Sequence, residues 1–324
     1  MKAAVYRSYG PPEVIKIEEV EKPVPNDHQV LIKIHASSIN AADYRPRSGS
    51  PFLLRLLNNG ILKPKNTRLG SDFSGRVEEI GARVKQFQPG DQVFGFTNGA
   101  FAEYGCSKES SIVIKPANIS FEEAAAVPVA AITALQGLRN AGAIQAGYKV
   151  VIQGASGGVG IFAIQLAKYF GAEVTAVCSA RNVEMSRSFG ADYVVDYTKE
   201  NFTQSGNRYD LIFAVNGYHS LPAYKRVLLP QGRYVCAGGS LSQIFEAMLL
   251  GPMMSRKDGR KMTSIGIAKI NQDDLVFLAR LLKDGKIVPV IDRCYPLTAI
   301  VEAFRYVEDT LPKGKVVINL ENHR

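Results

Sequence analysis

The sequence of 324 residues contains no tryptophan, and only four cysteines and four histidines. The cysteines are far apart and never form a Cys-x-x-Cys pair, which predicts neither a structural zinc site nor a disulfide framework. The histidines are also scattered along the chain. These residues are Cys106, Cys178, Cys236 and Cys294, and His28, His35, His219 and His323.

Long hydrophobic runs are also missing. No uninterrupted apolar stretch approaches the length that a membrane span needs, and the N-terminus leads directly into alternating polar sequence without an evident targeting peptide. We therefore expect a cytoplasmic protein with no membrane association. The formal charge is +9, but lysine and arginine are spread along the chain with only short local clusters, and no RNA-binding signature of aromatic and basic residues is evident. This distribution argues against a nucleic-acid partner, and an anionic cofactor explains part of the charge.

The pattern of short apolar runs divides the chain into two kinds of structure. Up to about residue 116, runs such as 30–34, 75–81 and 91–95 alternate with glycine and proline, which is typical of a mainly-β, barrel-like domain. From residue 121 the pattern becomes helical and then alternates strands with helices. Strands are expected at 150–153, 174–178, 193–197, 211–215, 232–237 and 262–267. These predict an open, doubly wound α/β sheet of about six strands.

The C-terminal part is expected to return to the first domain. A helix is predicted at 274–283, strands at 288–291 and 315–318, and a helix between them at 297–306. The predicted boundaries are therefore residues 1–121 with 287–324 for the mainly-β domain, and 122–286 for the doubly wound domain.

A glycine-rich turn joins the first strand of the βαβ series to an amphipathic helix. This strand–turn–helix order is the one that a dinucleotide site requires. A glycine at the tight turn, two where the backbone approaches a pyrophosphate, and one at the helix–strand contact fit that use. The turn comprises Gly154, Ser156, Gly157, Gly158, Val159 and Gly160.

The end of the next strand lacks the acidic residue that would bind the ribose diol of NAD. Ser179, Arg181 and Asn182 supply a hydroxyl, a guanidinium and an amide instead, and the first carboxylate is Glu184 in the following helix. This chemistry favours NADPH, whose 2′-phosphate these groups suit. The alternative is that Ser179 or Asn182 caps that helix and Arg181 is a solvated surface charge.

With these motifs the whole chain resembles the medium-chain dehydrogenase/reductase superfamily, specifically its zinc-free branch of quinone oxidoreductases and enoyl or alkenal reductases. The resemblance rests on the segments 38–43, 69–75, 77–81, 87–95, 131–135 and 314–318, together with the glycine turn. It implies a GroES-like domain beside a Rossmann domain, and a homodimer.

Zinc-dependent relatives bind their catalytic metal through a cysteine, a histidine and a second cysteine. The matching positions here are Asn40, Ser71 and Val129, none of which is a normal zinc ligand. The cysteine-rich lobe of those relatives is also missing between Phe96 and Phe101. No metal is therefore expected.

The resemblance implies hydride transfer from NADPH to a quinone or to a C=C bond conjugated to a carbonyl, as in an enone or alkenal. Asn40 is the candidate for contact with the substrate or the nicotinamide ribose, with a loop-structural role as the alternative. Asp43 is a candidate catalytic residue or holds the loop together, and Tyr44 is a candidate hydrogen-bond or proton donor. In the family the active-site tyrosine stands two residues after the aspartate, where this chain has Arg45.

Residue-wise matching adds two cofactor candidates. Thr133 matches a contact near the nicotinamide or phosphate, and Tyr197 is expected near the adenine, with sheet-edge packing as its alternative. Two apolar segments stay open. Residues 51–62 either cover the substrate or pack against the second domain or a partner subunit, and residues 241–254 form either a second apolar wall or core and interface.

Two competing functions are weighed against this reading. An enoyl-thioester reductase would need basic residues for the coenzyme A phosphate, which Lys63, Lys65 and Arg68 could supply. A non-catalytic NADPH-binding sensor, or an RNA-binding or structural protein, would bind the cofactor without turnover.

Overall fold

The computed structural model describes residues 1–50, 55, 60–255 and 259–321, and within them the chain separates into two compact units. Unit 1 comprises residues 1–129, 270–285 and 289–324, and unit 2 comprises residues 130–269 and 286–288. Each unit is described by itself below. No helix in the described part of the chain is long and apolar enough to cross a membrane.

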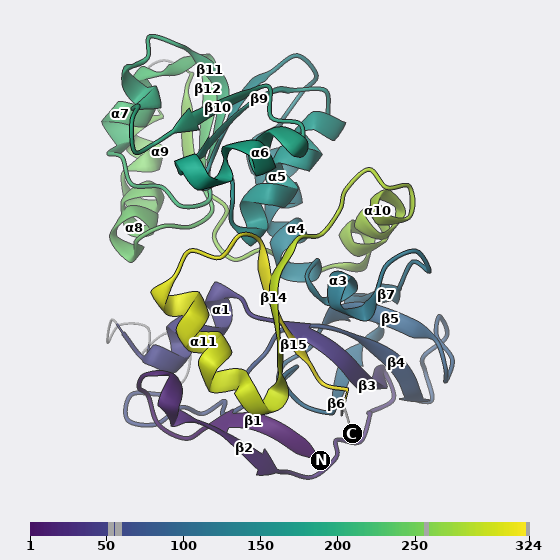
Figure 1. Ribbon diagram of the computed structural model, residues 1–324. Helices are drawn as coiled ribbons and strands as arrows, with labels where there is room; N and C mark the ends of the chain where they lie inside the picture. The colour runs from purple at the N-terminus through teal and green to yellow at the C-terminus, as the bar shows by residue number, and fades with distance from the viewer. Residues whose placement is uncertain (51–54, 56–59, 256–258, 322–324) are drawn as a thin grey trace. The chain divides into compact units, whose positions relative to one another are not determined.

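Unit 1 is the mainly-β unit, and strands from the first and the last third of the chain share its main sheet (Figure 1). Its strand order is β14-β15-β3-β4-β5-β7, with β6 also paired to β3, and β1 and β2 form a separate hairpin-like sheet. The strands are β1 (Lys2–Tyr6), β2 (Ile15–Glu19), β3 (Gln29–Ser38), β4 (Asp72–Ile80), β5 (Gln92–Phe96), β6 (Tyr104–Lys108), β7 (Ile112–Ile114), β14 (Ile291–Pro296) and β15 (Lys315–Asn319). Its helices are α1 (Ala41–Ser48), α3 (Phe121–Ala125), α10 (Gln272–Lys283) and α11 (Ile300–Asp309).

The helices of unit 1 begin at residues whose side chains stabilise a helix start. Ser120 accepts a hydrogen bond from the Glu123 backbone N–H before α3, and Asn271 accepts one from Asp274 before α10. The core of the unit is formed by strand residues such as Phe73 and Val93 together with Phe304 of α11, all buried.

Unit 2 is a six-stranded, all-parallel sheet in the order β10-β9-β8-β11-β12-β13, which confirms the predicted doubly wound fold. Its strands are β8 (Lys149–Gln153), β9 (Glu173–Cys178), β10 (Tyr193–Asp196), β11 (Tyr209–Ala214), β12 (Leu228–Cys236) and β13 (Lys261–Ser264). The helices are α5 (Gly158–Tyr169), α6 (Val183–Ser188), α7 (Leu221–Arg226), α8 (Leu241–Leu249) and α9 (Gly251–Met254); α4 (Pro128–Gln136) begins in unit 1 and continues into unit 2. Helices α5 and α6 contact β8, β9 and β10, and α7, α8 and α9 contact β12 and β13.

The predicted strand at 288–291 is wrong, because β14 begins only at Ile291. Pro289 has no backbone N–H to donate to a neighbouring strand, which shifts the start of pairing beyond it. The return of the C-terminal strands to the first unit is confirmed, since β15 pairs with β3. Helix α10 belongs to unit 1, whereas the sequence-based boundary counted it with the second domain.

Candidate active site and cofactor site

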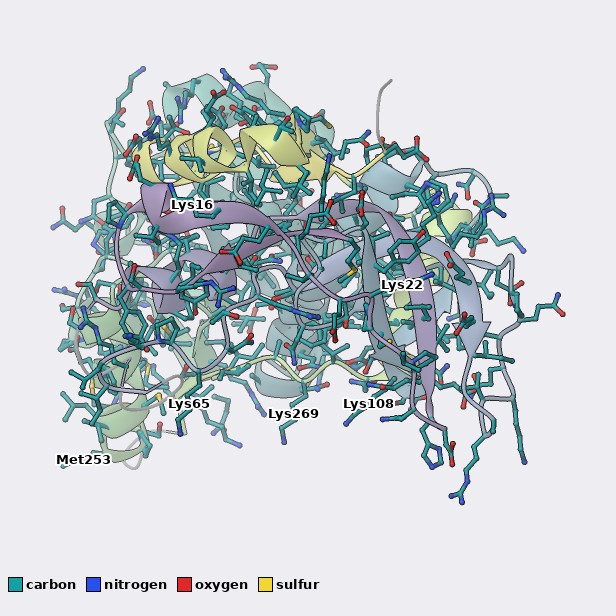
Figure 2. The ribbon with its side chains drawn as sticks, turned by 90° about the horizontal axis from the view of Figure 1, so that it is seen from below. Lys16, Lys22, Lys65, Lys108, Met253 and Lys269 are labelled. Carbon is teal, nitrogen blue, oxygen red and sulfur yellow. The ribbon has the colours of Figure 1, made fainter. Side chains whose placement is uncertain are left out.

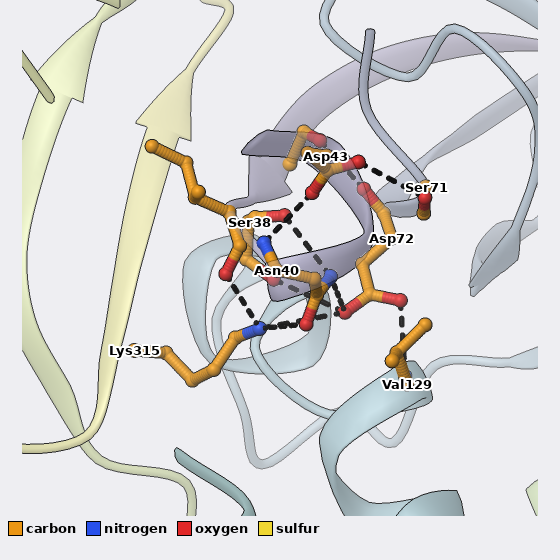
Figure 3. A network of polar contacts seen from close by, with 9 residues as sticks. Ser38, Asn40, Asp43, Ser71, Asp72, Val129 and Lys315 are labelled. Atoms are coloured by element: carbon orange, nitrogen blue, oxygen red, sulfur yellow. Dashed lines mark hydrogen bonds and ion pairs between the residues drawn. The ribbon is translucent and has the colours of Figure 1, made fainter. Parts of the chain in front are cut away.

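Buried polar side chains from three parts of unit 1 form one network, shown in Figure 3. Asn40 lies between β3 and α1, Asp72 is the first residue of β4, and Lys315 is the first residue of β15. The sheet register brings them together, because Ser38 of β3 stands opposite Asp72 of β4 and opposite Val317 of β15. Segments far apart in sequence thus meet beside the loop that contains Asn40.

The side-chain amide of Asn40 is held at both ends. Its Nδ2 donates to Asp72 Oδ2 at 2.9 Å, and its Oδ1 accepts a hydrogen bond from Lys315 Nζ at 2.5 Å. Lys315 Nζ also donates to the Ile39 carbonyl oxygen at 3.0 Å and lies 3.7 Å from Asp72 Oδ2. Asn40 is buried, and its amide is oriented by these partners.

Two carboxylates bind the other members of the network. Asp43 Oδ2 accepts from the Asn40 backbone N–H at 2.7 Å, and Asp43 Oδ1 accepts from Ser71 Oγ at 3.1 Å. Asp72 Oδ1 accepts from the Val129 backbone N–H at 3.0 Å. Asp43 and Asp72 thus accept hydrogen bonds from all three positions that match metal ligands in zinc-dependent relatives, namely Asn40, Ser71 and Val129.

The network contains two buried carboxyl groups and one buried ammonium. The pKa of Asp43 is raised to about 7, chiefly by burial and also by the neighbouring Asp72 charge, whereas the hydrogen bonds from Asn40 and Ser71 and the Lys315 charge oppose the shift. Burial also raises the pKa of Asp72 and lowers that of Lys315, and the attraction between the two groups opposes both shifts. With a single ammonium between two carboxyls, the cluster favours keeping a proton on Asp43 near neutral pH.

The donor set does not fit a zinc ion. Asn40, Ser71 and Val129 provide no thiolate or imidazole. The Lys315 ammonium already donates a hydrogen bond to Asn40 Oδ1, and its charge would repel a zinc ion bound there. Among the residues that the structure describes, no group of three or more His, Cys, Asp or Glu side chains could hold a metal ion.

Sequence reasoning missed the roles of Asp72 and Lys315. A lysine that opens the apolar strand Lys315–Asn319 was the available signal, because a lysine in such a run needs a buried partner. Tyr44 lies in α1 and is half-buried against the unit 1 core, next to Arg45 on the same helix. The functional roles predicted for Asn40, Asp43 and Tyr44 stay predictions.

The predicted cofactor residues lie mainly at one edge of unit 2. The parallel strands β8, β9 and β10 are adjacent, so the residues that follow their carboxyl ends share that edge. The glycine turn follows β8, Ser179 follows β9 and Tyr197 follows β10. The structure thus brings these candidates together, while Thr133 is half-buried within α4.

The glycine turn has the features that a pyrophosphate site needs. Gly154 has φ = +82°, a conformation that favours glycine, and a Cβ on Gly160 would lie 2.1 Å from the Gly154 carbonyl oxygen, so packing requires glycine at 160. At Gly157 the nearest atom to an added Cβ is 3.8 Å away. Gly157 precedes the first turn of α5, where backbone N–H groups lack helical acceptors. The residues present fit a bound dinucleotide.

The segment after β9 carries the candidates for the 2′-phosphate. Ser179 is half-buried and Arg181 is exposed, whereas Asn182 is buried and its Nδ2 donates to Ser179 Oγ at 3.2 Å. Neither Ser179 nor Asn182 makes a side-chain capping bond, so the capping alternative is not what these side chains do.

A carboxylate that the sequence pattern did not reveal lies beside this segment. Asp196, the last residue of β10, is aligned with Cys178 of β9. Its Oδ1 accepts hydrogen bonds from the backbone N–H and the hydroxyl of Thr198 at 3.1 and 2.8 Å, and its side chain is only 11% exposed. The Ala180 backbone N–H also helps to lower the pKa of Asp196, so this carboxyl borders the segment after β9 as well as its own turn, and its buried Oδ2 has no hydrogen-bond partner.

Tyr197 is exposed and meets another exposed tyrosine. Its ring centroid lies 6.0 Å from that of Tyr218, which follows β11, in an edge-to-face arrangement. Since β9 and β8 separate β10 from β11, Tyr218 reaches across the carboxyl edge of the sheet. The sequence pattern gave no indication of this contact.

The structure describes only one of the two apolar segments, 51–62 and 241–254, in full backbone detail. Residues 51–54 and 56–59 of the segment 51–62 lie outside the described residues. The segment 241–254 forms α8 and α9 and exposes several large side chains, with Met253 projecting at the periphery in Figure 2. These side chains are Phe245, Met248, Leu249, Leu250 and Met253.

Three lysines of unit 1 are far apart on its surface. Lys16 of β2, Lys22 beyond it and Lys108 of β6 lie apart at the surface in Figure 2. Lys22 Nζ lies 4.1 Å from the centroid of the Tyr104 ring. These positions do not gather into one continuous basic face.

The chain therefore combines a GroES-like unit with a Rossmann unit that carries a candidate dinucleotide site, a combination typical of oxidoreductases. Residues 26–117 match the family described as "Alcohol dehydrogenase GroES-like domain", and residues 189–318 match "Zinc-binding dehydrogenase". The chain belongs to the medium-chain dehydrogenase/reductase superfamily, in its branch of quinone and alkenal/one oxidoreductases.

Relatives are similar along nearly the full chain. The 2-methylene-furan-3-one reductase of Solanum lycopersicum is 35% identical over 98% of this chain and 79% of the relative. The chloroplastic NADPH-dependent alkenal/one oxidoreductase of Arabidopsis thaliana is 32% identical over the same shares. The solved structure of the quinone oxidoreductase from Coxiella burnetii is 30% identical, covers 99% of both chains and has a TM-score of 0.88.

Proposed function

We propose that this protein transfers hydride from NADPH to a quinone or to an α,β-unsaturated carbonyl compound, without a metal ion. The observation that carries the proposal is the hydrogen bond from Lys315 Nζ to Asn40 Oδ1, because it places a fixed ammonium where metal-dependent relatives would need a free ligand. Relatives named as reductases of quinones and of alkenals or enones support the acceptor class.

Bound NADPH supplies the hydride, and conjugation in the acceptor provides the electrophilic carbon. The backbone N–H groups around Gly157 bind the pyrophosphate, and the fixed turn at Gly154 presents them. The buried network around Asn40 keeps the loop that begins α1 in one conformation, so that its groups are preorganised for the acceptor.

NADPH is preferred over NADH in this proposal. Arg181 is exposed at the segment after β9, and Ser179 presents a hydroxyl in the same segment. A 2′-phosphate is stabilised by a guanidinium through a charge-assisted hydrogen bond. The homodimer and the cytoplasmic location stay predictions from the sequence.

The test is NADPH oxidation by metal-stripped protein with an ortho-quinone, a short 2-alkenal and an enoyl-CoA as acceptors, and with NADH as the control donor. Turnover of the quinone or the alkenal with NADPH is expected. Turnover confined to enoyl-CoA would replace the proposed acceptor with a thioester, and tight NADPH binding without oxidation of any acceptor would contradict the enzymatic proposal.

A further inference from the structure

A cavity within unit 1 borders the buried network. Its volume is about 230 Å³, and Asp43 and Ser71 both line it. The cavity lies between α1, residues 66–71 and residues 98–99, and Asn66, Arg68 and Asn98 also line it. A cavity of this size holds the reactive end of a small carbonyl compound.

Ser71 connects this cavity to the buried carboxyl of Asp43. Ser71 is half-buried, and its Oγ donates a hydrogen bond to Asp43 Oδ1 at 3.1 Å, the arrangement that an ionised Asp43 favours. Asp43 itself is only 4% exposed, so it reaches the cavity chiefly through the serine hydroxyl. A hydroxyl accepts and donates at the same time, and it rotates to suit its partners. When Asp43 is protonated, the roles in this pair reverse: Asp43 donates to Ser71 Oγ, and the Ser71 hydroxyl turns its own proton toward the cavity.

Burial and the Asp72 charge favour the protonated form of Asp43, whereas the Asn40 backbone N–H, Lys315 and the Ser71 hydroxyl favour its carboxylate, and the net effect is a raised pKa. Asp72 lies behind it in the network and disfavours a second negative charge, whereas Lys315 opposes that effect. Tyr6 and Arg68 line the cavity side, and Arg47, on the same helix, is paired with Glu308 of α11. Burial is the largest influence and raises the pKa of Asp43 to about 7. A proton is thus held next to the cavity in the range where a reductase of this kind operates.

We propose that Ser71 is a further catalytic residue, which protonates the oxygen of an acceptor bound in this cavity, and that Asp43 supplies the proton through it. This inference rests on the proposed function. Hydride adds to the β-carbon of an enone, and the π electrons move to the carbonyl oxygen. The Ser71 O–H bond breaks as the new enol O–H bond forms, and the Asp43 proton passes to Ser71 Oγ. The Asp43 carboxylate then regains a proton from water, and the released enol tautomerises to the saturated ketone.

The experiment compares the wild type with Ser71→Ala, Ser71→Thr and Asp43→Asn, with Ser110→Ala at an exposed position as the matched control. Single-turnover NADPH oxidation and kcat for an enone are measured from pH 5.5 to 9, in H₂O and D₂O. NADPH affinity and the thermal midpoint verify that each variant is folded; Ser71→Ala and Ser71→Thr leave the Asn40–Asp43 backbone contact intact.

We expect Ser71→Ala to lower kcat by roughly 10²-fold with KM changed by only a few-fold, and Ser71→Thr to retain most of the rate. The wild-type kcat should fall as the pH rises above about 7, and Asp43→Asn should abolish that dependence. If Ser71→Ala keeps the wild-type kcat, or if Asp43→Asn keeps the fall above pH 7, the inference is overturned while the reductase function stands. Failure of the wild type to oxidise NADPH with any enone or quinone overturns the proposed function and this inference with it.

Discussion

Replacing Lys315 with methionine should destabilise unit 1 strongly, although the two side chains are similar in length. Lys315 and Asp72 are 5% and 0% exposed, and their charged atoms are 3.7 Å apart. Removing the ammonium leaves the carboxyls of Asp72 and Asp43 buried without a positive charge, and it also leaves Asn40 Oδ1 without its donor. Breaking a buried ion pair by removing one partner costs about 3–5 kcal/mol.

For a domain of this size, that loss corresponds to a decrease of ~10 °C in the unfolding midpoint. Thermal and urea unfolding of Lys315→Met at pH 7.5 measure it, with Lys313→Met as the matched control, since Lys313 is exposed two residues earlier. Adding Asp72→Asn to Lys315→Met should recover part of the lost stability, because it removes the uncompensated charge. A Lys315→Met variant within about 0.5 kcal/mol of the wild type, the range of ordinary surface changes, would refute the account of the network.

Three further predictions follow from the two sites. Because the folded-state pKa of Asp43 is raised from 3.8 to about 7, the free energy of unfolding should fall by up to ~4 kcal/mol as the pH rises from about 4 to 7. Denaturant titrations of the wild type and Asp43→Asn at pH 5 and 8 should show a smaller loss in the variant, and equal losses would contradict the assignment. Gly157→Ala should keep the wild-type unfolding midpoint but weaken NADPH binding, measured by calorimetry, roughly tenfold, and an unchanged affinity would exclude the turn as the pyrophosphate site. Gly160→Ala should instead lower the midpoint, because its Cβ would lie 2.1 Å from the Gly154 carbonyl oxygen. Arg181→Ala should lower kcat/KM for NADPH by about tenfold and leave that for NADH unchanged, with the exposed Arg187→Ala as control, and an equal effect on both donors would count against the 2′-phosphate contact.

Local patterns in the sequence were sufficient for the Rossmann unit. The run of β8, the glycine turn and α5 are contiguous, and strands that alternate with helices predict a parallel sheet whose carboxyl ends share an edge. The position of Ser179 and Tyr197 on that edge follows from the same rule. The contact of Tyr197 with Tyr218 does not, because it joins loops that two strands separate.

The network of unit 1 depends on pairings that no local pattern encodes. Lys315 reaches Asn40 only because β15 pairs with β3 in a particular register, and Asp72 stands opposite Ser38 for the same reason. The sequence indicated Asn40 and Asp43 as candidates, but not that the Asn40 amide is held at both ends by protein groups. The strand predicted at 288–291 was wrong for a local reason: the prediction followed the apolar run and did not account for the backbone N–H that Pro289 lacks.

The most direct test of the central claim follows the hydride itself. The wild type is incubated with NADPH carrying deuterium at either face of C4 and with a short enone, and the product is analysed by mass spectrometry and NMR. The account predicts deuterium at the β-carbon of the saturated product from one of the two labelled donors, at a rate that does not change after metal removal. Tight NADPH binding with no deuterium in the product, or transfer only after zinc is added, would contradict it.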